Sequence, residues 1–178
     1  MTTDNPISAA IAVSNAGAVL LWPFLPLYLE RCGLVRDGQF ADAAANHRAV
    51  RLVHWLASSQ WADADAALPL DKIMCGLAPS TALLPTDDVL TAVELEWGQS
   101  LLHAVTQHWD SQRDTTVDGL RGAFLMRDGH LTQTGAGAGW QLDVQPRTFD
   151  VLLRSVPWAF SVIKFGWMPQ PLHVQWRY

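Results

Sequence analysis

The sequence predicts an α+β fold in which a helix-rich N-terminal two-thirds packs against a small antiparallel sheet of about four strands near the C-terminus. Two observations support this prediction. Apolar residues recur every three or four positions through the first two-thirds of the chain, and they alternate at every second position in the last third. At 178 residues we expect one globular domain, 1–178, with 1–8 flexible, 16–126 mainly helical and 130–176 mainly strands with one short helix.

The first element lies in a segment, residues 5–29, that contains no charged side chain. The segment is long enough to cross a bilayer, but Pro23 and Pro26 interrupt helical hydrogen bonding and no Lys or Arg precedes it. A secretion signal needs a basic start, whereas Asp4 is acidic. We therefore expect residues 16–31 to form a kinked or two-part helix that is buried in the protein.

The segment 41–59 has the spacing of an amphipathic helix. Its apolar residues fall three and four positions apart, and Arg48 and Arg51 lie off this stripe. A short helix over 70–77 is expected to end at Gly76, because glycine is favoured just after helix C-termini.

The longest helix is predicted over 87–109. Thr86 is placed to cap it, and the two Asp residues that follow suit the positive end of the helix dipole. Its expected buried face comprises Leu90, Val93, Trp97, Leu101, Ala104 and Val105. A shorter helix with a threonine cap is predicted over 117–126. Its apolar side comprises Leu120, Phe124 and Leu125.

Residues 130–134 and 140–145 are predicted to form paired strands around the glycine-rich segment 135–139. That segment contains a GxGxG pattern. Because it joins two predicted strands, a hairpin tip is favoured over a phosphate-binding loop. Downstream we expect one short helix and then two strands, over 148–156, 159–165 and 172–176.

Composition and charge narrow the classes of function. Charged residues make up only 16% of the chain and nine residues are Trp, which indicates a surface partly covered by a protein partner. The net charge of −5 and the lack of a basic cluster argue against nucleic acid as that partner. Candidate partner-contact residues are Trp22, Phe24, Trp158, Trp167 and Trp176. A place in the core is the alternative for these aromatic residues.

The sequence contains no established catalytic, cofactor or metal motif, so we predict none of these sites. Cys32 and Cys75 lack zinc or redox spacing and are expected to be reduced. His47 and His54 lie two helical turns apart, too far to share one metal without other ligands. An enzyme with a cryptic site would depend on Cys75, His103 or His108.

Several clusters of uncommon residues occur in a defined order. They are Asn15-Ala16-Gly17, Leu20-Leu-Trp-Pro-Phe-Leu-Pro26, Cys75-Gly76-Leu77, Val117-Asp118-Gly119-Leu120-Arg121, Phe124-Leu125, Pro157-Trp158, Ile163-Lys164, Trp167-Met168 and Leu172-His173-Val174-Gln175-Trp176. Together they resemble the tape-measure proteins of extracellular contractile injection systems, which are phage-tail-like particles that fire a rigid tube into a target cell. The resemblance covers nearly the whole chain, from Ser14 to Trp176.

The resemblance implies a non-catalytic structural or assembly module whose partners are tube, baseplate or other assembly proteins. It implies a location in the cytoplasm during assembly, and the released particle as a further location. Family members are commonly much longer, and this chain resembles their C-terminal region. A compact domain roughly 30–40 Å across cannot measure a long tube by its own contour. The open alternatives are an enzyme or delivered effector, and a membrane-active protein that uses residues 5–29.

Overall fold

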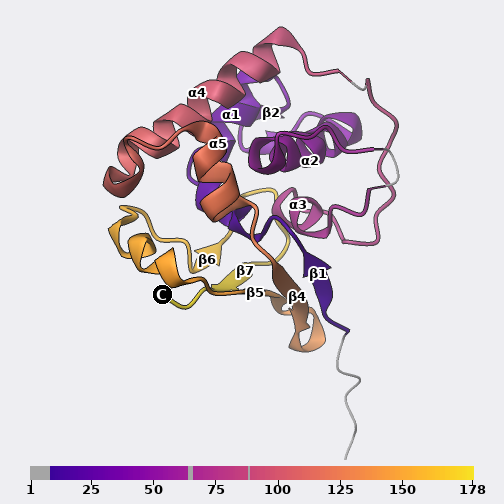
Figure 1. Cartoon of the computed structure of the whole chain (residues 1–178). Helices are drawn as coiled ribbons and strands as arrows, with labels where there is room; N and C mark the ends of the chain where they lie inside the picture. The colour runs from indigo at the N-terminus through magenta and orange to yellow at the C-terminus, as the bar shows by residue number, and fades with distance from the viewer. Residues whose placement is uncertain (1–8, 64–65, 88) are drawn as a thin grey trace, which may run out of the picture.

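The computed structural model describes residues 9–63, 66–87 and 89–178, so the expected flexible segment 1–8 lies outside the described residues. The helices gather on one side of the molecule and the main β-sheet lies on the other (Figure 1). One continuous core of buried apolar side chains includes residues from both layers.

In the described part of the chain, five strands form the main sheet in the order β1-β4-β5-β7-β6. These strands are β1 (Ile11–Val13), β4 (Gly129–Thr134), β5 (Gly139–Val144), β6 (Val162–Ile163) and β7 (Leu172–Gln175). The predicted sheet was therefore too small. It was also wrong in being all antiparallel, because β5 and β7 are parallel. The long connection between them allows β7 to enter beside β5 in the same direction.

Strand β1 was missed because three residues show no periodicity of their own. It becomes a strand by pairing with β4, with Ile11 opposite Leu131 and Val13 opposite Gly129. A hairpin of β2 (Val35–Arg36) and β3 (Gln39–Phe40) was also missed. Asp37 and Gly38 form its turn, with positive φ angles of 53° and 75°. The helix-rich N-terminal two-thirds is thus not confirmed, because strands from both sheets lie there.

Most of the uncharged N-terminal segment from residue 15 onward folds inward. Its described part contains the two expected helical pieces, a 3-10 helix η1 (Ala16–Leu21) and α1 (Leu25–Arg31), and every residue of η1 is buried. Gly17 is required here, because a Cβ at this position would lie 1.6 Å from the Phe124 carbonyl oxygen. Among the described helices, none has the length and apolar character needed to span a membrane.

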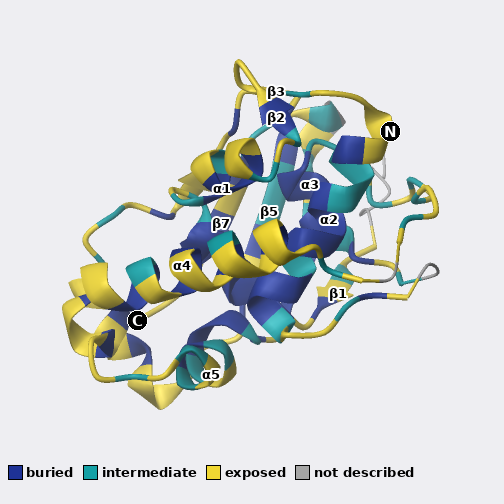
Figure 2. Cartoon of the chain, turned by 90° about the horizontal axis from the view of Figure 1, so that it is seen from above, coloured by how far each residue is buried: buried dark blue, intermediate teal, exposed yellow. Residues whose placement is uncertain are grey.

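Helix α2 (Ala43–Ser58) is the buried centre of the helical layer (Figure 2). It begins at Asp42, whose carboxylate accepts a hydrogen bond from the Ala45 N–H at 2.7 Å. Arg51 was expected off the apolar stripe, but it is only 1% exposed. Neighbouring elements therefore enclose more of α2 than its apolar stripe alone requires. Helix α3 (Pro69–Met74) follows, and Gly76 lies just beyond it with φ of 80°.

Helix α4 (Ala92–His108) begins later than predicted, and Thr91 rather than Thr86 is its cap. The reason is a capping box: Thr91 Oγ1 accepts from the Glu94 N–H, and the Glu94 carboxylate accepts from the Thr91 N–H. A 3-10 turn η2 (Asp110–Gln112) follows the helix. The predicted helix over 117–126 is α5 (Val117–Leu120), capped by Thr116, continued by a π-helical turn η3 (Arg121–Leu125).

The C-terminal third follows the predicted pattern with local differences. β4 and β5 pair around the 3-10 turn η4 (Gly135–Gly137), which confirms the hairpin. The predicted short helix is the 3-10 helix η5 (Thr148–Ser155), whereas the strand expected over 159–165 shrinks to β6. In the last strand, β7, Leu172 and Val174 are buried and alternate with exposed residues, as the period of two predicts.

Candidate docking surface

Helices α1 and α4 lie side by side (Figure 2). At one end, the Phe24 ring centroid lies 6.0 Å from that of His108. At the other end, the Arg31 guanidinium lies 3.9 Å from the Trp97 ring centroid. The Tyr28 hydroxyl donates to the carbonyl of Glu94, in the first turn of α4, at 3.1 Å. The start of α1 therefore faces the end of α4.

A groove with a volume of about 190 Å³ lies between these two helices. Its walls are largely apolar, and Arg31 is the charged residue in its lining. Leu27, on the α1 wall, is 54% exposed, a large value for a leucine. The principal apolar and aromatic lining residues are Phe24, Leu27, Tyr28, Trp97, Leu101 and Ala104.

The apolar stripe predicted on α4 explains the position of this groove. The stripe was expected to face the core, but Val93 is 47% exposed, while Trp97 and Ala104 are partly exposed and line the groove. The core-facing side of α4 instead includes Gly98, where a Cβ would lie 2.3 Å from the Trp55 ring. This close approach of α2 turns part of the apolar stripe toward the solvent.

Two of the predicted contact residues join the N-terminal and C-terminal segments of the chain. The Trp22 indole N–H donates to the Ala159 carbonyl at 2.8 Å, and the Trp158 indole N–H donates to the Leu20 carbonyl at 3.1 Å. Both rings are partly buried, and Trp158 also packs edge-on against Phe24 at 5.2 Å. These tryptophans hold together segments that are far apart in the sequence.

Trp167 and Trp176 also make internal contacts. The Trp167 indole N–H donates to the Met74 carbonyl at 2.9 Å, and its ring stacks on Phe165 at 4.7 Å. Trp176 is 7% exposed and donates to the Asp150 carboxylate at 3.0 Å. Of the five candidates, Phe24 is the one that lines the groove. Partner contact by the five residues stays a prediction.

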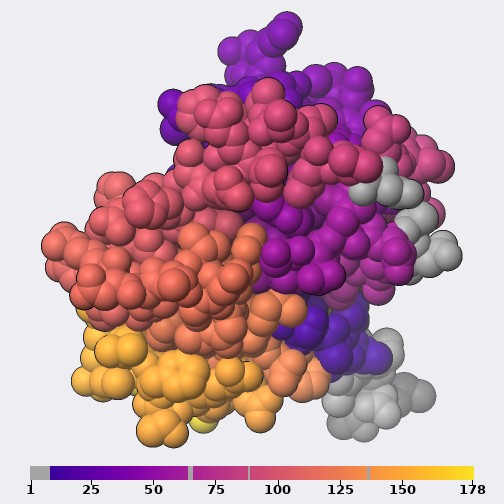
Figure 3. Space-filling model, turned by 45° about the horizontal axis from the view of Figure 1, so that its top comes forward, coloured from indigo at the N-terminus to yellow at the C-terminus, as the bar shows by residue number. Residues whose placement is uncertain are grey.

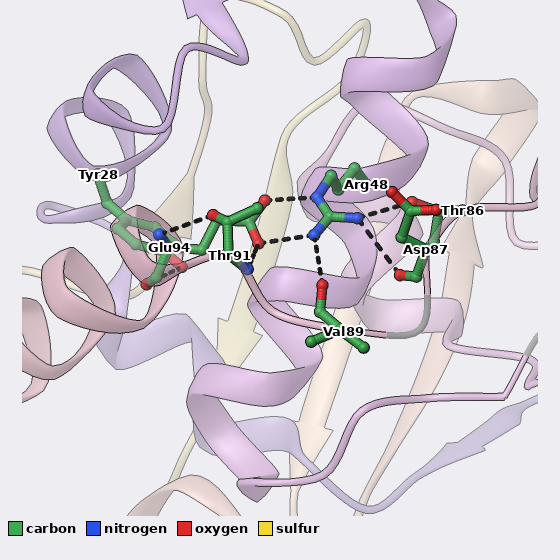
Figure 4. Close-up of polar contacts among 7 residues, drawn as sticks. All are labelled: Tyr28, Arg48, Thr86, Asp87, Val89, Thr91 and Glu94. Carbon is green, nitrogen blue, oxygen red and sulfur yellow. Dashed lines mark hydrogen bonds and ion pairs between the residues drawn. The ribbon is translucent and has the colours of Figure 1, made fainter.

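Sequence reasoning missed a polar cluster around Arg48, which joins α2 to the start of α4 and to the connection before it (Figure 4). The guanidinium donates to both carboxylate oxygens of Glu94, to the Thr86 hydroxyl at 2.7 Å and to the Val89 carbonyl at 3.1 Å. Burial tends to raise the pKa of Glu94, but the hydrogen bonds from Arg48 and Thr91 lower it below its usual value. The carboxylate therefore stays charged.

A second cluster missed from the sequence is buried between η1, α2 and α3. Asn15 Nδ2 donates to both carboxylate oxygens of Asp71, at 2.9 and 3.1 Å. His54 Nδ1 lies 3.8 Å from the same carboxylate, and its pKa is lowered by burial. Burial raises the pKa of Asp71 to about 7. The hydrogen bonds from the Asn15 amide stabilise the charge of this acid less than burial destabilises it.

The residues on which an enzyme would depend do not form one site. Cys75 is buried just beyond α3, and burial raises the pKa of its thiol. His103 and His108, in contrast, are exposed on α4. Both cysteines are free, as expected. Within the described ranges, no three His, Cys, Asp or Glu side chains come together as metal ligands.

A continuous apolar core, a five-stranded mixed sheet within the described residues and an exposed groove between two helices define a small mixed α/β fold. A family model described as "contractile injection system tape measure protein" matches residues 2–176. The chain therefore belongs to this family, and the resemblance drawn from its motifs is confirmed. No curated protein and no solved structure shows significant similarity to it.

Residues of the motif clusters occupy structurally important positions in the fold. Gly17 and Gly76, both in the motif clusters, lie where backbones approach closely: a Cβ at Gly76 would be 2.4 Å from the Trp167 carbonyl oxygen. Trp22, Trp158 and Trp167 each donate an indole hydrogen bond to a backbone carbonyl in a distant segment of the chain. The motifs thus specify the packing of this fold. The family assigns the protein a structural role in contractile injection systems.

Proposed function

We propose that this protein is a non-catalytic assembly module of a contractile injection particle, folded as one globular unit over 1–178, that docks on a tube, baseplate or other assembly protein. The match of the family model over residues 2–176 carries this proposal. A compact module cannot set tube length by its own contour, so its contribution would be to attach or position other parts of the length-setting apparatus.

The surface supports a docking role. Leu27 on α1 and Val93 on α4 are 54% and 47% exposed. Figure 3 shows atoms of α4, in pink, beside atoms of the C-terminal third, in orange and yellow, on one broad face. Exposed apolar side chains concentrated on neighbouring helices are typical of surfaces that a protein partner covers.

Isolation of the tagged protein from the organism that produces it, during particle assembly, tests the proposal. We expect tube or baseplate proteins to be enriched in mass spectrometry relative to a tagged unrelated protein of similar size. We also expect deletion of the gene to leave particles absent or of altered length in electron microscopy. Normal particles in the deletion strain, together with no enrichment of tube or baseplate proteins, would refute the proposal.

A further inference from the structure

We propose that the groove between α1 and α4 binds the apolar face of an amphipathic helix from another particle protein, and that an acidic residue of that helix lies beside Arg31. This inference rests on the proposed docking function and identifies the surface and the chemistry of the partner.

The shape of the groove favours a helix as the occupant. The α4 side chains that line it, from Trp97 to Ala104, span about 10 Å along the axis at 1.5 Å per residue, which is two helical turns. The antiparallel wall formed by α1 is of similar length. A third helix laid over an antiparallel pair can place residues three or four positions apart into the groove between them.

The volume of the groove limits what enters it. About 190 Å³ is slightly more than the roughly 150 Å³ cavity that holds one benzene ring, so one large or two small apolar side chains fit. The incoming helix therefore inserts anchor side chains and rests its backbone on the rim. Leu27 and Val93, both about half exposed, are positioned to be covered as the helix binds.

Charge at the rim favours an acidic partner. Arg31 lies over the Trp97 ring, and in the part of the chain that the structure describes it forms no ion pair with an acid. Among the described residues, none that lines the groove carries a carboxylate. A helix that carries Glu or Asp beside its apolar stripe would supply the missing charge, whereas one that carries Lys would meet repulsion.

The same charge argues against a second copy of this chain as the occupant. Another exposed apolar helical face is that of η5, where Phe149, Val151 and Leu152 are 37%, 52% and 39% exposed. The exposed charged residues of this segment are Arg147 and Arg154, because Asp150 is buried. Placing η5 in the groove would therefore bring arginine toward Arg31.

Synthetic helical peptides of about 20 residues test the inference with the full chain. One peptide carries a leucine stripe flanked by Glu, a second carries the same stripe flanked by Lys, and a third carries the Glu peptide's residues with the stripe scrambled. We expect the Glu peptide to bind most tightly and the scrambled peptide to bind at least about tenfold more weakly, as measured by fluorescence anisotropy.

Substitutions in the protein locate the binding surface. Leu27→Glu should weaken binding of the Glu peptide at least about tenfold. Val151→Glu is the matched control, because Val151 is 52% exposed and lies outside the groove, and it should change binding by less than about twofold. Ser100→Trp, which fills the groove from an exposed position, provides a second variant with little risk to folding. It too should block binding.

A charge exchange tests the role of Arg31. Arg31→Glu should weaken binding of the Glu peptide about threefold and strengthen binding of the Lys peptide by a similar factor. Equal binding of the two peptides to wild type, equal loss in Leu27→Glu and Val151→Glu, or no binding of any peptide at roughly millimolar concentration would each overturn the inference. A wild-type dimer that Leu27→Glu dissociates would overturn it in favour of a second copy.

The peptide-binding experiments can fail or succeed independently of the proposed assembly role. If tube or baseplate proteins co-purify with the chain while the peptides fail, the assembly role stands and the groove assignment is wrong. If the Glu peptide binds as described but no particle protein co-purifies and the deletion strain makes normal particles, the groove binds helices and the assembly role fails. The two experiments therefore test different statements.

Discussion

Two arginine–carboxylate pairs hold this protein together, and they lie in different surroundings. Arg127 pairs with Asp150 where both side chains are almost completely buried, with exposures of 0% and 1%. Arg48 pairs with Glu94 where the side chains are 14% and 5% exposed. The first pair is covered by aromatic rings, whereas the second lies beside a long connection between helices.

The difference lies in what each arginine holds. Arg127 donates to both Asp150 oxygens, at 2.6 and 2.8 Å, and to the Gln145 carbonyl at 2.8 Å, and it lies 5.2 Å from the Trp176 ring centroid. It therefore fixes the sheet to η5. Arg48 holds the segment that leads into α4, and thereby the start of one groove wall. One pair stabilises the core and the other stabilises a surface.

Asp71 completes the comparison, because it is a buried carboxylate to which an amide, that of Asn15, donates two hydrogen bonds. Hydrogen bonds from Arg127 and Trp176 overcome the effect of burial and lower the pKa of Asp150, and Arg48 does the same for Glu94. With an amide in place of an arginine, burial prevails and the pKa of Asp71 rises. The hydrogen-bond donor to each buried carboxylate therefore decides whether its pKa is raised or lowered.

The largest effect is expected from Arg127→Met, which leaves Asp150 buried and charged without its main partner. The loss in free energy of unfolding should be about 3–5 kcal/mol, measured by urea denaturation. The double variant Arg127→Met with Asp150→Leu removes both charges and should be less destabilised than the single one. A double variant that is worse than the single variant would contradict this explanation.

Arg48→Met should lower the free energy of unfolding by less, about 1.5–3 kcal/mol. The Arg48–Glu94 pair is partly exposed, so water can replace some of its hydrogen bonds. We also expect faster hydrogen exchange of the amides near Val89 and Thr91, while amides of β4 and β5 keep their protection. Uniformly faster exchange throughout the chain would show that Arg48 supports the core as much as the surface.

Asp71→Asn tests the third carboxylate through pH. Because the pKa of Asp71 is raised from 3.8 to about 7 on folding, the folded state binds the extra proton between these values. This contribution to stability is present at low pH and is lost as pH rises through 7. At pH 8, Asp71→Asn should therefore be more stable than wild type by roughly 1 kcal/mol or more.

The difference between Asp71→Asn and wild type should shrink as the pH falls toward 4. Measuring both proteins isolates Asp71 from His54, whose lowered pKa acts in the opposite sense by making stability rise with pH below 6.5. Asp150→Asn is the matched contrast, because the pKa of Asp150 is lowered on folding and that variant should lose stability at pH 8. Parallel pH profiles for the two variants would refute the distinction.

The smallest effect is expected at the surface pair between Arg121 and Asp118. The Asp118 side chain is 88% exposed and lies 3.4 Å from the guanidinium. Asp118→Asn should change the free energy of unfolding by less than about 0.5 kcal/mol, and added salt should remove even that difference. A cost comparable with that of Arg48→Met would mean that exposure does not govern the strength of these pairs.

Much of the fold could be predicted from local patterns. The two-part N-terminal helix follows from Pro23 and Pro26, the β4–β5 hairpin from two alternating segments around glycines, and β7 from its period of two. The sheet was less predictable. β1 is three residues long and exists through its pairing with β4, and the parallel β5–β7 contact depends on a long crossover.

The candidate surface was predicted only in part. The sequence indicated an apolar stripe on α4 and named Phe24 as a contact residue. It could not indicate that Gly98 packs against Trp55 and so turns Trp97 and Ala104 toward a groove. Helical periodicity defines the angle between side chains around one helix. It does not define which angle faces the core, because that depends on the neighbouring helix.

The sequence by itself determined the family, through its ordered clusters of uncommon residues. It also favoured the inward burial of its uncharged N-terminal segment, because contact with water does not stabilise so apolar a stretch. Tertiary structure alone decided the partners of the buried charges and the exposure of the groove. Asp71, Glu94 and Asp150 are all acids in the sequence, and only the folded chain determines which of them an arginine reaches. Such pairings join residues far apart in the sequence, and local periodicity carries no information about them.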